Sequence, residues 1–342
     1  MSLARLARLA AACILLAACG SMASPGGPES LVAADEVREI VSVLAADSLQ
    51  GRRTGTPGSA RASRFLAERM RRYGLEPVGD SGYFQPVTYE VAQGPEGETL
   101  RLAQPDSIAA GGRVVDYNLV GVIRGSDPDL RDEAVVLGAH FDHVGVGKPV
   151  EGDSIYNGAD DDASGVAAVL TAARALAKDP PRRTVVVLLT SGEEFGVLGT
   201  EWYLERPRFP LETTVADLQV EMVGRPDTLV GAGKLWLTGF ERSNMGEMLS
   251  RAGVPVVADP RPEFRFFERS DNIVFALRGI PAHTLSSFGL HRDYHQPSDE
   301  VERIDFEHLA RAADLVTRAA RVLADGPRPS WSPGGRPTPS TP

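Results

Sequence analysis

The sequence predicts an α/β domain with a mixed, mostly parallel central sheet sandwiched between helices. Segments with the helical spacing of apolar residues alternate along the chain with short β-branched runs, an order of elements that places helices on both faces of a sheet. The run at residues 185–189 (VVVLL) is continuously apolar, as expected of a strand that is buried on both faces. A chain of 342 residues is long enough for one such domain with a tail at each end.

The elements of this domain are predicted from the spacing of apolar residues, in chain order. The expected helices span residues 34–45, 59–73, 164–178, 243–252 and 306–323. The expected strands span residues 118–123, 134–139, 183–190, 215–222, 235–238 and 282–285. In the second helix, for example, Phe65, Leu66 and Met70 fall near one face, so the helix is expected to bury that face.

The first nineteen residues have the features of an export signal. Two arginines precede an apolar stretch, residues 9–18, that is too short to span a bilayer. The segment ends in Leu-Ala-Ala-Cys at Cys19 and resembles a bacterial lipoprotein signal, in which this cysteine is lipidated. We expect an exported protein held by its lipid alone, at the outer membrane facing the periplasm because Gly20 follows the cysteine. The alternative is a plain secretory signal and a soluble periplasmic or secreted protein.

Four segments are expected along the chain. The signal with its lipidation site occupies residues 1–19, and a flexible tether of small residues, Pro and Gly occupies residues 20–30. The folded domain is expected over residues 31–325. Residues 326–342 are rich in Pro, Ser and Gly and are expected to be disordered, because they cannot bury enough apolar area to order themselves.

Charge and cysteine content exclude several classes of function. The net charge is −10, which argues against a nucleic-acid partner because such proteins need a basic face to neutralise phosphates. Both cysteines, Cys13 and Cys19, lie in the export signal, so no thiolate remains for a disulfide, a metal site or a nucleophile. Neither a Gly-x-Ser-x-Gly elbow nor a phosphate-binding glycine loop occurs. Because the folded domain has no cysteine, any metal must be held by histidines and carboxylates.

Histidines and carboxylates gather where the predicted strands end and where a helix begins. The candidates are His140 and Asp142 after the strand 134–139, Asp161 before the helix 164–178, Glu193 and Glu194 after the strand 183–190, Glu221 near the end of the strand 215–222, and His295 in the loop 289–299. Active sites of such folds lie beyond the carboxyl ends of the strands, so we expect these side chains to converge. Converging carboxylates repel one another, and a bound divalent cation relieves that repulsion.

Two of these histidines and three of the carboxylates form a set of ligands suited to zinc. They are His140, Asp161, Glu194, Glu221 and His295. Five ligands are too many for one open catalytic zinc, which uses three protein ligands. They suit two ions that lie roughly 3.5–4 Å apart and share a bridging carboxylate.

Five segments resemble, in order and spacing, the motifs of the bacterial double-zinc aminopeptidases, whose relatives include glutamate carboxypeptidase and glutaminyl cyclase. The segments are residues 138–142 (GAHFD), 157–165 (NGADDDASG), 191–194 (SGEE), 221–225 (EMVGR) and 293–299 (DYHQPSD). The resemblance extends over residues 44–323, nearly the whole folded domain. It implies a zinc peptidase domain of the phosphorylase/hydrolase-like kind over residues 31–325, two Zn²⁺ per chain, and peptide substrates with a free N-terminus.

The resemblance also implies which residues hold the metals. His140 and Glu221 would bind one zinc, Glu194 and His295 the other, and Asp161 would bridge the two. The peptide bond that follows the bridging aspartate is expected to be cis. Glu221 departs from the family pattern, which usually has Asp there; its side chain is one methylene longer, so the zinc–oxygen geometry must shift.

Two further acidic residues are implied in catalysis. Asp142 would accept a hydrogen bond from the free ring N–H of His140 and so fix its tautomer. Glu193 would act as general base towards a water molecule and then as general acid towards the leaving amine. The zinc ions would lower the pKa of the water and polarise the scissile carbonyl.

The remaining histidines outside the motifs are interpreted as structural, with His291 also a candidate for lining a substrate pocket. They are His143, His283, His291 and His308. Phe264, Phe266 and Phe267 are expected either to line a pocket for the substrate side chain or to cap the core. The alternatives to an aminopeptidase are a carboxypeptidase, dipeptidase or glutaminyl cyclase on the same scaffold, and a non-catalytic, lipid-anchored binding protein.

Overall fold

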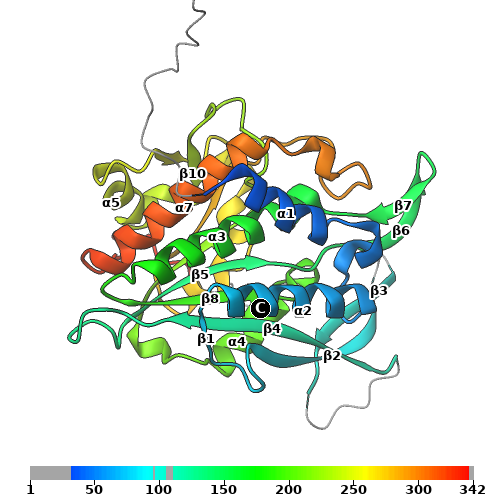
Figure 1. Cartoon of the computed structure of the whole chain (residues 1–342), viewed down its shortest axis with the longest axis horizontal. Coiled ribbons are helices and arrows are strands. Elements are labelled where there is room, and N and C mark those ends of the chain that lie inside the picture. The colour runs from blue at the N-terminus through cyan, green and yellow to red at the C-terminus, as the bar shows by residue number, and fades with distance from the viewer. Residues whose placement is uncertain (1–31, 95–96, 105–110, 339–342) are drawn as a thin grey trace, which may run out of the picture.

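A mixed ten-stranded sheet forms the centre of the molecule, which confirms the predicted fold class. The computed structural model describes residues 32–94, 97–104 and 111–338. The predicted export signal and tether therefore lie outside the described residues. The strands follow the order β11-β10-β12-β9-β5-β8-β4-β2-β3, and β1 pairs with β4. Helices cover the sheet on both faces (Figure 1).

Four parallel strands form the middle of the sheet. In spatial order they are β12 (Ala282–Ser286), β9 (Thr214–Val220), β5 (Ala134–His140) and β8 (Thr184–Thr190). Every residue of these strands is buried. Because helices cover both of its faces, β8 is apolar between its terminal threonines rather than alternating.

Strands at the two sides complete the sheet. On one side lie β4 (Arg113–Ile123), β2 (Phe84–Gly94) and β3 (Gly97–Leu102), all antiparallel to their neighbours, with the short β1 (Glu76–Pro77) paired to β4. On the other side lie β10 (Leu235–Leu237) and β11 (Val256–Ala258). A separate hairpin of β6 (Gly145–Val150) and β7 (Asp153–Tyr156) projects from the body near the end of β5 (Figure 1). The sequence pattern predicts neither β2 nor β3, whose partly exposed residues include several polar ones.

Two layers of helices enclose two separate apolar cores. One layer holds α1 (Ala34–Leu44), α2 (Pro57–Arg72), α3 (Gly165–Lys178), α5 (Met245–Arg251) and α7 (Phe306–Asp325); the other holds α4 (Leu198–Glu205) and α6 (Asn272–Leu277). Along β8, Val185 and Val187 pack in the first core, whereas Val186 and Leu188 pack in the second. Successive side chains of a strand point to opposite faces, so one continuous apolar run supplies both cores.

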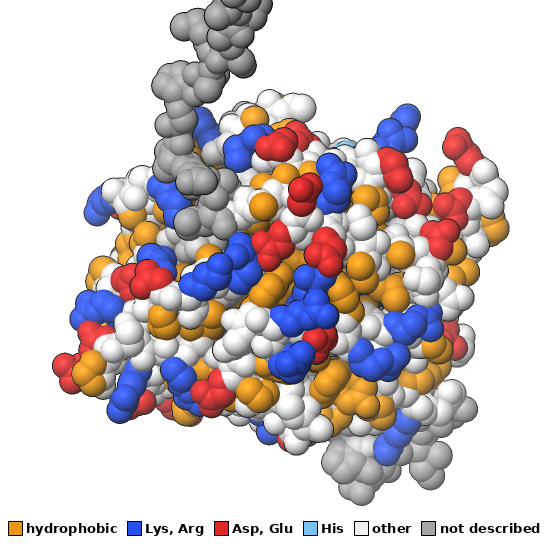
Figure 2. Space-filling model, in the orientation of Figure 1, with side chains coloured by type: hydrophobic (Ala, Val, Ile, Leu, Met, Phe, Trp, Pro, Cys, Tyr) orange, Lys and Arg blue, Asp and Glu red, His pale blue; other side chains and the backbone are white. Residues whose placement is uncertain are grey.

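The face formed by α1, α2, α3 and α7 carries both signs of charge interspersed (Figure 2). On α2, for example, Arg71 and Arg72 pair with Glu68 at 2.8 and 2.9 Å. Exposed ion pairs of this kind contribute little to stability, because water and salt screen them. The helix therefore depends mainly on its buried face, where Leu66 and Met70 are fully enclosed.

The expectation of a disordered tail over residues 326–342 is wrong for the part that the structure describes, residues 326–338. Trp331 pairs with Ser243 as a β-bridge and donates its ring N–H to the carbonyl oxygen of Gly279 at 2.9 Å. Its ring also lies beside those of Phe267 and His283, at centroid distances of 6.5 and 5.8 Å. One aromatic anchor thus supplies the contacts that the segment's average composition does not predict.

Candidate metal centre

The predicted histidines and carboxylates converge at the carboxyl ends of three adjacent strands. His140 is the last residue of β5 and lies in register with Thr190, the last residue of β8. Glu221 directly follows β9. Glu193 lies in a short helical turn just after β8. Parallel strands end at the same edge of a sheet, so residues far apart in the sequence meet there.

Asp161 reaches this edge from the loop before α3. It lies in an irregular helical turn (Ala159–Ser164) that precedes α3. The peptide bond between Asp161 and Asp162 is cis, as the sequence motif implies. Asp299 holds this turn in place, because its carboxylate accepts hydrogen bonds from the backbone N–H groups of Asp160 and Asp161 at 3.0 Å.

The first group of candidate ligands consists of His140, Asp161 and Glu221, whose ligand atoms lie within 4.8 Å of one another. The Nε2 atom of His140 is 3.3 Å from Oδ1 of Asp161. This nitrogen is buried and has no hydrogen-bond partner among the described residues. Burial and the nearby charge of Asp161 raise the pKa of Glu221 to about 7. We call this set group 1.

The second group consists of Asp161, Glu194, His295 and His143, with ligand atoms that also lie within 4.8 Å of one another. Nε2 of His295 is 3.1 Å from Oδ2 of Asp161 and 3.1 Å from Oε2 of Glu194. Burial lowers the pKa of His295, but its contacts with these two carboxylates outweigh burial and raise the pKa to about 10. We call this set group 2.

Asp161 belongs to both groups and divides its two oxygens between them. Oδ1 faces His140 of group 1, whereas Oδ2 faces His295 of group 2. A carboxylate with one oxygen directed to each of two sites is disposed to bridge two ions. All five residues expected as metal ligands are therefore brought together in the predicted division.

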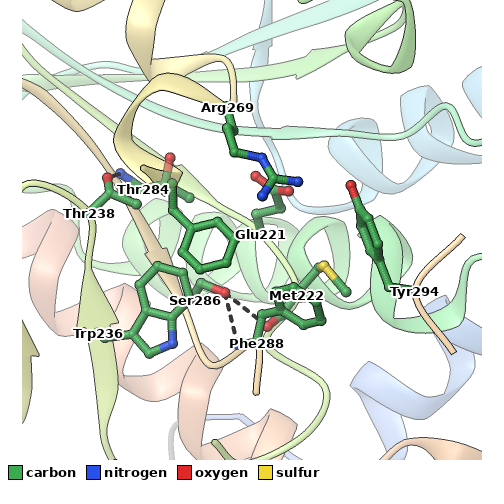
Figure 3. Close-up of a pocket in the computed structure, with 10 residues that line it drawn as sticks. Glu221, Met222, Trp236, Thr238, Arg269, Thr284, Ser286, Phe288 and Tyr294 are labelled. Atoms are coloured by element: carbon green, nitrogen blue, oxygen red, sulfur yellow. Dashed lines mark hydrogen bonds between the residues drawn. The ribbon is translucent and has the colours of Figure 1, made fainter. Parts of the chain in front are cut away.

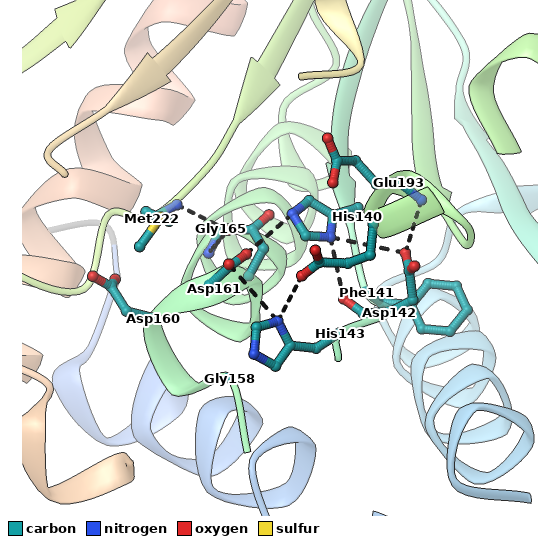
Figure 4. A network of polar contacts seen from close by, with 12 residues as sticks. His140, Phe141, Asp142, His143, Gly158, Asp160, Asp161, Gly165, Glu193 and Met222 are labelled. Carbon is teal, nitrogen blue, oxygen red and sulfur yellow. Dashed lines mark hydrogen bonds and ion pairs between the residues drawn. The ribbon is translucent and has the colours of Figure 1, made fainter. Parts of the chain in front are cut away.

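His143 joins this centre, in contrast to the expectation that it has only a structural role. Its Nδ1 atom is 2.7 Å from Oε1 of Glu194 and 3.7 Å from Oδ2 of Asp161 (Figure 4). The only local signal for this position is its spacing, three residues after His140 at the end of the same buried strand. Spacing alone does not tell whether the intervening loop turns the second ring towards the site.

Asp142 lies differently from the expectation that its carboxylate accepts the ring N–H of His140. Nδ1 of His140 is 3.2 Å from the backbone oxygen of Asp142 but 3.8 Å from the carboxylate. The carboxylate instead accepts hydrogen bonds from the hydroxyl of Thr54 at 2.9 Å and from the backbone N–H of Glu193 at 3.2 Å. Asp142 therefore holds His140 through its main chain and Glu193 through its side chain (Figure 4).

Glu193 is half-buried at the edge of both groups. Burial raises the pKa of its carboxyl group well above the usual range, and the neighbouring charges of Glu221 and Glu194 add to this rise. A carboxylate that holds a proton more readily is a better base near neutral pH. Its side chain makes no hydrogen bond that would occupy it within the described part of the chain, which leaves it free for a reacting water.

Arg52 holds together the two loops that carry His140 and Asp161, a role that the sequence analysis does not predict. The fully buried guanidinium donates to five backbone carbonyl groups, those of Leu44, Phe141, Asn157, Gly158 and Asp161, at 2.6–3.5 Å. Phe141 follows His140, and the last three carbonyls lead into the turn of Asp161. One side chain thus ties together the loops after β5 and before α3, and nothing local in the sequence indicates these distant partners.

A pocket opens beside Glu221, and four of the ten residues that line it are aromatic (Figure 3). Its walls include Trp236, Phe266, Phe288 and Tyr294. Trp236 and Phe266 are stacked with ring centroids 5.3 Å apart. Of the three phenylalanines expected near a pocket, Phe266 lines it, whereas Phe267 packs in the second core. An apolar side chain of a substrate can therefore lie next to group 1.

The residues of both groups fit zinc. Imidazole nitrogens and carboxylate oxygens are its ordinary ligands in proteins that lack thiolates. The buried Nε2 of His140, which has no partner among the described residues, matches a nitrogen whose lone pair is reserved for a metal. Burial and then repulsion by Asp161 raise the pKa of Glu221. A cation between the carboxylates relieves that repulsion.

A comparison with models of protein families identifies one family. The model of that family, described as peptidase family M28, matches residues 118–320, which is more than half of the chain. A probable leucine aminopeptidase 2 of Aspergillus fumigatus is 30% identical over 48% of this chain and 32% of its own length. Aminopeptidase YwaD of Bacillus subtilis is 26% identical over 59% of this chain and 43% of its own length. The chain thus spans less than half the length of these two curated relatives.

The fold also matches a solved structure along almost its whole length. The aminopeptidase from Aneurinibacillus sp. strain AM-1 superimposes with a TM-score of 0.62 at 18% identity, covering 86% of this chain and 95% of that one. At this identity the likeness shows that the two chains share a fold.

Proposed function

The chain belongs to peptidase family M28, and from this premise we propose that it is a zinc aminopeptidase that removes N-terminal residues from peptides. The observation that carries the proposal is the meeting of groups 1 and 2 at Asp161, next to a pocket that reaches Glu221. The aminopeptidases among its relatives support it. The peptidase domain in this proposal occupies residues 31–325.

Groups 1 and 2 would each hold a zinc ion, and these ions would supply Lewis-acid chemistry that lowers the pKa of a water molecule and polarises the carbonyl of the scissile bond. Glu193 takes up the proton of that water and passes it to the leaving amine. The carboxylate of Asp142 positions Glu193 by accepting a hydrogen bond from the backbone N–H of Glu193. The backbone carbonyl oxygen of Asp142 positions the ring of His140. The aromatic pocket receives the side chain of the N-terminal residue.

The negative charges of two carboxylates in the metal centre account for selection of peptides with a free N-terminus. Asp161 and Glu194 together present two carboxylates beside His295. A free α-amine can donate hydrogen bonds to such carboxylates, whereas an acetylated one has lost most of its donors and its charge. Peptides with blocked N-termini are therefore poor substrates in this proposal.

The test is hydrolysis of a set of aminoacyl-p-nitroanilides and of matching N-acetylated compounds, with and without a chelator. We expect release of p-nitroaniline from the unblocked compounds alone, abolished by the chelator and restored by zinc. Cleavage of dipeptides or of C-terminal residues without such release would favour the carboxypeptidase and dipeptidase alternatives. Cyclisation of an N-terminal glutamine would favour a cyclase, and binding without turnover would favour a non-catalytic protein.

We also propose that the chain is exported and held at the outer membrane, facing the periplasm, by lipid on Cys19. No helix within the described part of the chain is both long and apolar enough to cross a membrane. The support is the sequence Leu-Ala-Ala-Cys at the end of the apolar leader. Fractionation of cells that express Cys19→Ser tests the anchor: the variant should leave the membrane fraction, and its retention there would exclude lipid as the anchor.

A further inference from the structure

We propose that the pocket beside Glu221 selects peptides whose N-terminal residue is acidic, above all glutamate, and that Arg269 recognises the carboxylate of that side chain. The inference rests on the proposed function and names the substrates of the same site. Among the ten residues that line the pocket, all of them described, only Arg269 and Glu221 are charged. The pocket therefore offers an anionic side chain one cationic partner.

The guanidinium group of Arg269 pairs with no carboxylate of the protein within the described residues. Its one charge-based contact there is with the ring of Phe266, whose centroid lies 5.2 Å from Cζ of Arg269. The adjacent acid, Glu268, pairs with Arg265 instead. An arginine side chain is always charged and has five N–H donors. The exposed side chain of Arg269 therefore keeps its charge and its donors for a ligand.

Contacts with the aromatic wall hold Arg269 at the pocket. Its backbone N–H donates to the carbonyl oxygen of Phe266 at 3.1 Å, just after the helical turn Phe266–Glu268. Phe266 is itself fixed by burial and by stacking on Trp236, with ring centroids 5.3 Å apart. Figure 3 shows the guanidinium group of Arg269 directed towards the centre of the lining residues. The positive charge is thus placed where the side chain of a substrate enters.

Glu221, the other charged residue of the pocket, is already engaged elsewhere. Its carboxylate belongs to group 1, where its ligand atom lies within 4.8 Å of those of His140 and Asp161. A zinc ion bound there would compensate its charge. An N-terminal lysine or arginine would therefore find no free acid in the pocket and would place its own charge beside Arg269. The charges of the pocket thus favour acidic side chains and disfavour basic ones.

The remaining walls suit the stem of a glutamate side chain. Trp236 and Phe288 are apolar surfaces against which its methylene groups can pack. Thr238, Thr284 and Ser286 are each only 2% exposed, so this part of the pocket is closed and receives a side chain rather than a continuing peptide. The hydroxyl of Thr238 accepts the backbone N–H of Thr284 at 2.9 Å, and its own O–H has no acceptor among the described residues. It is a second donor for a carboxylate.

The experiment compares kcat/KM of the zinc-loaded full chain for the p-nitroanilides of glutamate, glutamine, leucine and lysine. Glutamate and glutamine have nearly the same size and differ in charge. We expect glutamate to exceed glutamine by at least about tenfold, the contribution of one hydrogen bond between charged groups, and lysine to be the poorest. The preference should fall as the ionic strength rises, because salt screens an exposed charge. A ratio of glutamate to glutamine near one would overturn the proposal.

Variants assign the preference to Arg269. Arg269→Met keeps an apolar stem and removes the charge, so the ratio of glutamate to glutamine should fall to about one, and Arg269→Glu should shift the preference towards lysine. Arg265→Met is the matched control, because Arg265 lies in the same segment and pairs with Glu268 but does not line the pocket; it should leave the ratio unchanged. An equal loss for the glutamate, glutamine and leucine compounds in Arg269→Met would overturn the proposal.

Binding separates this inference from the proposed function. Free glutamate and glutamine are titrated calorimetrically into the native chain and into Arg269→Met. We expect glutamate to bind the native chain more tightly than glutamine does, and to lose that advantage in the variant. Absence of hydrolysis would contradict the aminopeptidase, while glutamate binding that depends on Arg269 would still support an acidic pocket. Equal binding of the two amino acids would overturn the inference alone.

The C-terminus of a short peptide is the other source of a carboxylate for Arg269. The p-nitroanilides have no C-terminal carboxylate, whereas the dipeptide Leu-Gly has one. We expect Arg269→Met to lower hydrolysis of Leu-Gly no more than that of leucine p-nitroanilide. A selective loss for the dipeptide, with a native ratio of glutamate to glutamine near one, would assign Arg269 to the C-terminus and overturn the proposal.

Discussion

Two regions of the molecule bury histidines in opposite ways. At the strand ends, Nε2 of His140 and Nε2 of His143 lack hydrogen-bond partners among the described residues, and carboxylates crowd around them. On β12, beside Phe267 of the second core, His283 has both ring nitrogens occupied. Its Nδ1 is 2.7 Å from the carbonyl oxygen of Thr238, and its Nε2 is 2.6 Å from the hydroxyl of Ser243.

The pKa values of histidines in the two regions move in opposite directions, because their neighbours differ. Burial lowers the pKa of His283 to about 4, so this ring stays neutral in the folded protein. At the strand ends, contacts with Asp161 and Glu194 outweigh burial and raise the pKa of His295 to about 10. A buried histidine with complete hydrogen bonds stabilises a fold, whereas an incomplete one among carboxylates indicates a site that a cation completes.

The largest expected effect comes from the residue that the two metal groups share. Asp161→Asn should release both ions and reduce hydrolysis to the background rate, because each oxygen of Asp161 faces a different group. Zinc content and p-nitroanilide hydrolysis measure the outcome. The matched control is Asp160→Asn, at an adjacent buried acid outside both groups, which should keep both ions. An Asp161→Asn variant that retains both would show that the groups do not depend on a bridge.

Glu193→Gln should separate catalysis from metal binding. We expect kcat to fall by about 10²–10⁴-fold, the usual contribution of a general base, with the zinc content unchanged. The amide keeps the size of the side chain but cannot take up the proton. Loss of zinc together with activity would make Glu193 a part of the metal site rather than a base.

Arg52→Lys should weaken the link between the loops without touching a metal ligand. An ammonium group has three donors and cannot serve the five carbonyl groups that Arg52 reaches. Each buried carbonyl left without a partner costs about 1–3 kcal/mol, so the free energy of unfolding should fall measurably in denaturant titrations. Zinc affinity should fall as well, because the loops of His140 and Asp161 lose their common support. Unchanged affinity alongside lower stability would limit Arg52 to a role in folding.

His283→Gln should change how the free energy of unfolding depends on pH. The pKa of His283 is about 4 in the folded state against 6.5 in the unfolded state, so between these values the unfolded chain binds the additional proton. The wild-type contribution is therefore lost as the pH falls from 6.5 to 4, by up to about 3 kcal/mol at 1.36 kcal/mol per unit. The variant lacks this loss, and the difference between its unfolding curves and those of the wild type should shrink on acidification. A constant difference would mean that His283 is not held neutral.

Much of the fold can be predicted from the spacing of apolar residues along the chain. The predicted bounds of strand β8 agree with the structure to within one residue, because its apolar run is continuous and has no helical period. Those of helix α3 agree equally well, because its apolar residues recur with helical spacing. The hairpin of β2 and β3 is not predicted, because its strands are partly exposed at the edge of the sheet. Periodicity reports burial, so it is weakest where a strand is only half covered.

The sequence by itself determined the order of the elements and the residues at the ends of the strands. It therefore placed His140, Glu193 and Glu221 at one edge, because alternation of strands and helices makes neighbouring strands parallel. Only the tertiary structure decided that His143 turns into group 2, that Asp142 offers its carbonyl oxygen to His140, and that residues 326–338 pack on the domain. These outcomes depend on side-chain directions and on contacts between distant segments, which no local spacing encodes.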